Sequence, residues 1–133
     1  MGRIKNTSYL LDTHAAIWFF NGDDKISQTA QNAILDFSNR KFISIASAWE
    51  IAIKIGLGKL DFDGKAAGFI HLAEDSGFTI LPIKTVYLTA LETLPLIHRD
   101  PFDRLLVATA LDEQMTIITA DENIAKYPVS HIW

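Results

Sequence analysis

The chain has 133 residues, and its hydrophobic fraction of 49% supplies enough apolar surface for one compact domain over residues 1–133 and excludes a disordered protein. The formal net charge of −4 disfavours a protein that stays bound to duplex DNA, but leaves open a transient nucleic-acid enzyme whose acids bind metal. Cysteine is absent, which excludes disulfides, thiolate metal sites and a cysteine nucleophile, so any metal ion must be bound by oxygen or imidazole.

The chain starts with a polar segment, and we expect residues 1–7 to be flexible. This segment lacks the apolar core of a signal peptide, and no stretch of the chain approaches the roughly 20 apolar residues needed to span a bilayer. We therefore expect a soluble, cytoplasmic protein.

Short β-rich segments alternate with helical patterns along the first half of the chain. Serines mark two of the helix starts: Ser27 is a candidate N-cap, and Ser47 with Glu50 fits a capping box. In chain order, the predicted elements are a strand over 8–11, a helix over 14–20, a helix over 27–39, a strand over 42–45 and a helix over 47–55.

The second half continues the alternation, and Asp100 followed by Pro101 is typical of a helix start. The predicted elements are a helix over 64–76, a strand over 78–81, a helix over 85–93, a loop over 95–99, a helix over 101–114, a strand over 115–119 and an edge strand within 127–132. Strands separated by long helices favour parallel pairing through helical crossovers. The predicted fold class is therefore α/β, with a parallel sheet of four to five strands flanked by helices.

Acidic residues follow three of the predicted strands. Asp12 comes directly after the first strand, Glu50 shortly after the second, and Asp121 after the fourth. Because crossovers leave parallel strands at the same edge of a sheet, we expect these three side chains at one rim. Asp103 begins a helix that leads into a strand, so its approach to the rim depends on the path of the loop over 95–99.

Each acid also has a purely structural interpretation. Glu50 completes a capping box, Asp103 suits the positive end of a helix dipole, and Asp121 is an ordinary turn residue. Asp12 is harder to explain in this way, because it interrupts an apolar segment without a turn signal and has no lysine or arginine nearby in the sequence. A divalent metal ion would supply the missing counter-charge.

If the four acids converge, their all-carboxylate site favours Mg²⁺ or Mn²⁺. Such ions activate water and offset charge on the leaving oxygen of a phosphodiester. Without metal, the carboxylates would repel one another and raise one another's pKa.

Other motifs give weaker indications. Gly56-Leu-Gly58-Lys59 is only a fragment of a phosphate loop, and we interpret it as a helix stop. Arg104 could pair with Asp100 on one helix face or, like Arg99, bind a phosphate. The histidines lack metal-ligand spacing and are interpreted as structural residues or substrate contacts: His14, His71, His98 and His131.

Four segments together resemble the PIN-domain family and, within it, the VapC-like toxins of toxin–antitoxin pairs. They are Leu10-Leu-Asp12-Thr-His14, Ser47-Ala-Trp-Glu50-Ile51, His98-Arg-Asp-Pro-Phe-Asp103-Arg104 and Thr119-Ala-Asp121. The resemblance covers nearly the whole chain. It implies a parallel sheet flanked by helices and the activity of a metal-dependent endoribonuclease.

The resemblance also implies a set of site residues. The family's acidic quartet, which binds metal and carries catalysis, matches Asp12, Glu50, Asp103 and Asp121. Thr13 and Thr119 match neighbours that support the acids by hydrogen bonding, and Asp100 lies near enough to Asp103 in sequence to assist.

The implied ligands and partners are Mg²⁺ or Mn²⁺, an RNA substrate, a small antitoxin protein whose tail lies over the acidic pocket, and a second copy of the chain in a homodimer. A homodimer would use apolar helical surface, for which the candidates are Trp18, Phe19, Phe20 and Phe69. Such residues are more often part of a core.

Two alternatives come from other functional classes. A phospho-accepting receiver domain also combines a parallel sheet with strand-end aspartates and magnesium, but it needs a further acid after the third strand, which here ends in Leu81-Pro82, and a lysine after the last strand. A non-catalytic binding module would use its acids only as helix caps. Metal would neither stabilise such a module nor confer cleavage.

Overall fold

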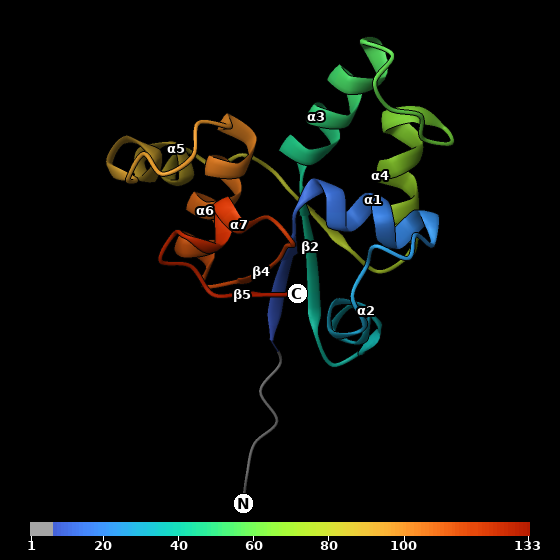
Figure 1. Ribbon diagram of the computed structural model, residues 1–133, viewed down its shortest axis with the longest axis horizontal. Coiled ribbons are helices and arrows are strands. Elements are labelled where there is room, and N and C mark those ends of the chain that lie inside the picture. The colour runs from blue at the N-terminus through green and yellow to red at the C-terminus, as the bar shows by residue number, and fades with distance from the viewer. Residues whose placement is uncertain (1–6) are drawn as a thin grey trace, which may run out of the picture.

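The computed structural model describes residues 7–133, which form a five-stranded sheet with helices on both faces (Figure 1). The strand order is β3-β2-β1-β4-β5, and every neighbouring pair is parallel. The strands are β1 (Ser8–Leu11), β2 (Arg40–Ser44), β3 (Thr79–Leu81), β4 (Thr116–Ile118) and β5 (His131–Ile132). The predicted α/β class and parallel sheet are confirmed, and the carboxyl ends of all strands share one rim.

The helices form two layers around this sheet. They are α1 (Thr13–Asn21), α2 (Gln28–Leu35), α3 (Ile45–Gly56), α4 (Lys65–Asp75), α5 (Thr85–Thr93), α6 (Pro101–Glu113) and α7 (Glu122–Ala125). In Figure 1, α1 to α4 lie on one side of the strands, and α5 to α7 lie on the other.

Consecutive residues of the strands enter opposite layers of the core. Leu11, Ile43 and Ile118 pack with the apolar side chains of α1 to α4, whereas Leu10 and Ile117 pack with those of α6 and α7. Cβ atoms alternate across a strand, and a parallel sheet is covered on both faces, so both kinds of position must be apolar. This explains why the strands are continuous apolar segments in the sequence.

Helix α3 begins earlier than predicted. Its N-cap is Ser44, the last residue of β2, whose hydroxyl accepts a hydrogen bond from the Ala46 N–H at 3.0 Å. The predicted capping box of Ser47 and Glu50 is therefore wrong, because the strand passes into the helix with no intervening loop and both residues already lie inside the helix. The helix-stop interpretation of the glycines is confirmed: α3 ends at Gly56, and Gly58 follows with a φ of +70°.

Helix α2 ends at Leu35, earlier than the predicted end near residue 39. The side chain of Asp36 accepts hydrogen bonds from the backbone N–H and the hydroxyl of Ser38, at 2.9 and 2.7 Å. This local turn competes with the helix for the backbone and ends it.

The last part of the chain also differs from the prediction. The short helix α7 was not predicted, because four residues are too few for a helical periodicity to be visible. The edge strand is limited to β5, and Tyr127 and Val129, which precede it, are buried against the core of α6 and α7 instead.

The predicted flexibility of residues 1–7 falls almost entirely outside the described residues. Thr7 is described, and its carbonyl accepts a hydrogen bond from the Arg40 N–H at 2.9 Å. Within residues 7–133, no helix combines the length and the apolar character needed to cross a membrane.

Candidate metal centre

Asp12 lies at the rim between the ends of β1 and β4. Its side chain caps α1 by accepting the Ala15 N–H at 2.7 Å, and its second oxygen accepts a hydrogen bond from the hydroxyl of Thr119, which follows β4. The residue is only 5% exposed. Burial raises the pKa of Asp12 above its ordinary value, although these two hydrogen bonds and His14 act in the opposite direction.

Glu50 lies in the second turn of α3 and is connected to the start of α1. The Thr13 hydroxyl donates to Glu50 Oε1 at 2.7 Å and lies 3.0 Å from the Ser47 hydroxyl. The other oxygen of Glu50 forms an ion pair with Lys54 Nζ at 3.0 Å. Both carboxylate oxygens of this buried residue therefore have partners in the protein.

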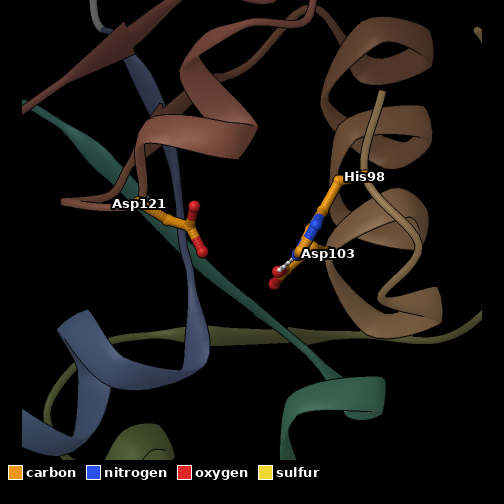
Figure 2. Close-up of side chains that lie close together, drawn as sticks. All are labelled: His98, Asp103 and Asp121. Carbon is orange, nitrogen blue, oxygen red and sulfur yellow. Dashed lines mark hydrogen bonds and ion pairs between the residues drawn. The ribbon is translucent and has the colours of Figure 1, made fainter. Parts of the chain in front are cut away.

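Asp103 and Asp121 face each other across the rim, together with a histidine (Figure 2). His98 Nε2 lies 3.1 Å from Asp103 Oδ2, and the side chain of Asp121 points towards this pair from the loop after β4. One ligand atom from each of the three residues lies within 4.8 Å of the other two. Within residues 7–133 this is the cluster with metal-ligand spacing.

The charges of the other three predicted acids act on Asp103. The pKa of Asp103 is raised to about 7, first by burial and then by repulsion from Asp100, Asp121, Asp12 and Glu50. Among residues 7–133, Asp12, Asp103 and Asp121 form no ion pair with lysine or arginine. Oxygen-rich donors with uncompensated negative charge fit a hard divalent cation, so the residues present suit the ion that the sequence predicts.

Sequence reasoning missed two contributors to this rim. His98 was assigned to no site, although it contacts Asp103 and stands five residues before it; only the folding back of the loop over 95–99 brings the two together. Lys54 contacts Glu50 across one helical turn, and this i, i+4 spacing was readable from the sequence. His71 and His131 are exposed and lie outside the cluster.

Arg104 forms no ion pair with Asp100 within residues 7–133, and its contact with a phosphate stays a prediction. Its guanidinium donates to the carbonyl of Pro95 at 2.9 Å, to the Tyr127 hydroxyl at 3.2 Å, and to the carbonyls of Leu91 and Leu94 at 3.4 Å. Its donors are therefore used to hold the chain between α5 and α6. Asp100 instead caps α6 by accepting the Phe102 N–H at 2.8 Å, while Arg99 is exposed.

Tyr127 fixes the loop that carries His98. Its hydroxyl accepts the backbone N–H of His98 at 2.9 Å, lies 3.3 Å from the His98 carbonyl, and also accepts from Arg104. The Tyr127 side chain is buried, so this hydroxyl is a fixed anchor inside the protein. The path of the loop, which the sequence left open, is thus set by one hydroxyl and one guanidinium.

Removing the charge of Asp103 should change how stability depends on pH in metal-free protein. Between its ordinary pKa of 3.8 and about 7, folded Asp103 retains a proton that the unfolded chain has released. The free energy of unfolding should therefore fall as pH rises through this range. Asp103→Asn should make the free energy of unfolding less dependent on pH. Near pH 8 the free energy of unfolding of the variant should exceed that of the wild type by about 1 kcal/mol, a value discounted for partial solvation of the side chain.

Urea unfolding in EDTA near both ends of that range measures the effect. Asp75→Asn, at the exposed end of α4, is the matched control and should keep the wild-type dependence. The repulsion among the acids would be contradicted if Asp103→Asn had the same pH dependence as the wild type.

Removing the Tyr127 hydroxyl should loosen the loop over 95–99. We expect Tyr127→Phe to lower the free energy of unfolding by about 1 kcal/mol, because the partly buried partners of the hydroxyl lose their hydrogen bonds. Affinity for Mg²⁺ or Mn²⁺, measured by calorimetry, should fall about tenfold or more, as for other residues that orient metal ligands. Tyr9→Phe is the control, since the Tyr9 hydroxyl makes no hydrogen bond within residues 7–133. Equal effects of the two variants would contradict the role of the Tyr127 hydroxyl as the anchor of the loop.

Comparison with known proteins agrees with this arrangement. The sequence profile of the PIN domain family matches residues 9–129. Ribonuclease VapC22 of Mycobacterium tuberculosis (strain ATCC 25618 / H37Rv) is 23% identical over 121 residues, which cover 91% of this chain and 92% of that protein.

Solved structures share the fold at low sequence identity. VapBC2 from Rickettsia felis, bound to a DNA fragment from their promoter, superposes with a TM-score of 0.70 at 16% identity, covering 95% of this chain and 98% of that one. FitAcB from Neisseria gonorrhoeae superposes with a TM-score of 0.65 at 18% identity, covering 94% and 96%. Since the family profile spans every described helix, the rim acids and all strands except β5, apart from the first residue of β1, the chain belongs to the PIN domain family.

Proposed function

We propose that this protein is a metal-dependent endoribonuclease that hydrolyses RNA phosphodiester bonds as the toxin of a toxin–antitoxin pair. The observation that carries the proposal is the convergence of Asp103, Asp121 and His98 within 4.8 Å, where burial and then the neighbouring acids raise the pKa of Asp103 to about 7. Family membership and similarity to a protein named as a ribonuclease support it. The receiver-domain alternative is set aside, because the chain belongs to a different family.

We propose Asp12, Glu50, Asp103 and Asp121 as the catalytic and metal-binding residues, with Mg²⁺ or Mn²⁺ as the ion. When bound, the ion supplies Lewis acidity and positive charge for the phosphodiester. Asp103, whose pKa is raised to about 7, would hold the ion as a carboxylate, so it would have to be deprotonated. Glu50 becomes a direct ligand only if one of its oxygens exchanges its partner in the protein, Thr13 or Lys54, for the ion.

The neighbouring residues orient these acids and extend the site. Thr119 holds Asp12 and Thr13 holds Glu50, so both hydroxyls act by fixing carboxylates. His98 joins the acids as a possible nitrogen ligand or as a hydrogen-bond partner of Asp103. For Arg99, which is exposed and follows His98 in the chain, we propose a contact with a phosphate of the RNA.

Metal-dependent cleavage is the direct test of the proposed function. Purified protein should cut a mixed RNA pool with Mg²⁺ or Mn²⁺ and should not cut it in EDTA. Asp12→Asn and Asp121→Asn should reduce the rate by roughly 100-fold or more, since charge stabilisation at such a centre is worth several kcal/mol. Asp12→Asn should remain folded, because its amide oxygen can still cap α1 and one repelling charge is gone.

Asp75→Asn serves again as the control and should cut at the wild-type rate. Thermal unfolding with and without Mn²⁺ separates a nuclease with a narrow RNA target from a protein with no metal site. No cleavage together with no metal-induced stabilisation would contradict the proposal and favour the binding module, in which the acids only cap helices.

We propose an antitoxin and a second copy of the chain as protein partners. The proposal of an antitoxin draws on similarity to a toxin–antitoxin complex from Klebsiella pneumoniae, with a TM-score of 0.64 at 19% identity. Among the predicted candidates for the homodimer, Phe69 is fully buried and both Phe19 and Phe20 pack against the same core, which leaves the half-buried Trp18. Exposed apolar side chains instead follow one face of α3 at helical spacing: Trp49, Ile53 and Leu57.

Sedimentation of the protein alone tests the homodimer. The wild type should sediment as a dimer, and a variant carrying Trp49→Ser and Leu57→Ser should sediment as a monomer, because two exposed apolar anchors are lost. Leu35→Ser, a comparably exposed leucine on α2, is the control and should remain dimeric. A monomeric wild type would remove the homodimer from the proposal without affecting the nuclease.

A further inference from the structure

A pocket of about 230 Å³ opens beside the acidic rim, between α1 and the loop after β4. It is lined by Asp12, His14, Trp18, Ala120 and Asp121. We propose that this pocket binds one unpaired nucleobase of the RNA, next to the phosphodiester that is cut. The inference rests on the proposed nuclease function and specifies its substrate as RNA with an unstacked base at the cleavage site.

The aromatic wall of the pocket is built from α1 and supported from behind. His14 and Trp18 stand one helical turn apart, with ring centroids separated by 5.7 Å. Trp133 meets Trp18 edge to face at 5.8 Å, and the Lys25 ammonium lies 5.7 Å from the Trp18 ring centroid. Trp18 is half-buried, so these neighbours hold its ring while part of it still faces the pocket.

The size and position of the pocket suit a single base. Its volume lies below the roughly 300–1,000 Å³ of pockets that hold drug-sized ligands, so one ring system fits and a longer stretch of RNA does not. Asp12 and Asp121 form both part of its wall and part of the proposed metal centre. A base in the pocket would therefore leave its neighbouring phosphate over the acids.

The charges around the pocket favour a neutral aromatic occupant. Without a bound metal ion, the carboxylates of Asp12 and Asp121 disfavour a phosphate inside the pocket, whereas a nucleobase carries no net charge. A cationic side chain would be attracted to the acids, but Lys25 already supplies a cation to Trp18. Lys25 is also exposed and can pair with a phosphate of the same strand. Stacking of unpaired bases on aromatic side chains is a common mode of single-strand recognition.

Binding of neutral probes to the full-length protein tests the pocket without metal or cleavage. In metal-free buffer, we expect adenosine and uridine to shift the indole N–H resonances of Trp18 and Trp133 saturably, and ribose at the same concentrations to leave them unchanged. Trp49, the remaining tryptophan, packs against Phe102 and does not line the pocket, so it is the internal control. Trp18→Phe should retain the response at Trp133, and Trp18→Leu should abolish it.

Three results of this titration would overturn the proposal. They are no shift with any nucleoside, equal shifts with ribose and nucleoside, or a response at Trp18 to N-acetyl-arginine amide and not to nucleosides. The last result would assign the pocket to a cationic side chain of a protein partner. Because Trp18→Leu could unfold the chain, His14→Ala, at an exposed position, is the second variant and should weaken the nucleoside response.

Cleavage of abasic substrates provides the second arm. In an RNA that the protein cuts, removing the base beside the cleaved bond should lower kcat/KM by roughly 5- to 100-fold, the range expected for loss of one stacked base. Removing the base should change kcat/KM little for the Trp18→Leu variant. The control is Phe37→Leu, which replaces an exposed aromatic side chain at the opposite end of the sheet, and removing the base should lower its kcat/KM as much as for the wild type.

The two arms separate failure of the pocket from failure of the nuclease. If RNA is cut, but abasic sites leave kcat/KM unchanged and nucleosides leave the tryptophan resonances unchanged, the proposed nuclease function is supported and the proposed base pocket is wrong. If no RNA is cut, the nucleoside titration still decides whether the pocket binds a base.

Discussion

Repulsion among the carboxylates at the rim of the sheet is the interaction on which the functional part of this structure depends. The parallel topology forces it, because β1 and β4 are neighbours and both end in an aspartate or lead directly to one. Asp103 joins these acids from α6, and burial together with repulsion from the other acids raises its pKa to about 7. The remainder of the fold must hold these carboxylates in place against their mutual repulsion. A divalent cation bound between them would turn this repulsion into attraction.

Helix capping provides part of that restraint. Asp12 caps α1, Asp100 caps α6 and Asp121 caps α7, each with a side-chain oxygen on backbone N–H groups. A helix N-terminus carries partial positive charge, so it both orients a carboxylate and offsets some of its repulsion. The structural and the proposed functional roles of these acids are therefore compatible, since capping occupies one carboxylate oxygen and leaves the second for another partner, which for Asp12 is the Thr119 hydroxyl.

The sequence predicts the parts of this protein that depend on local pattern and on the strand rule. The first four strands, α5 and the placement of Asp12 and Asp121 at one rim follow from apolar segments and chain order. The start of α3 was wrong because two serines could each cap a helix, and only the end of β2 decides between them. The contact of His98 with Asp103 depends on Tyr127, 29 residues away, and no local pattern encodes it.

The segment after α7 contributes to both sides of the rim. Tyr127 anchors the loop that carries His98, and Trp133 supports Trp18 on α1, while β5 joins the sheet through only two residues at its edge. Short edge strands with few ladder hydrogen bonds belong to the part of a protein that opens most easily. Local opening of residues 127–133 would release both walls of the rim together, so backbone hydrogen exchange in this segment should track exchange in the loop over 95–99 as one cooperative unit.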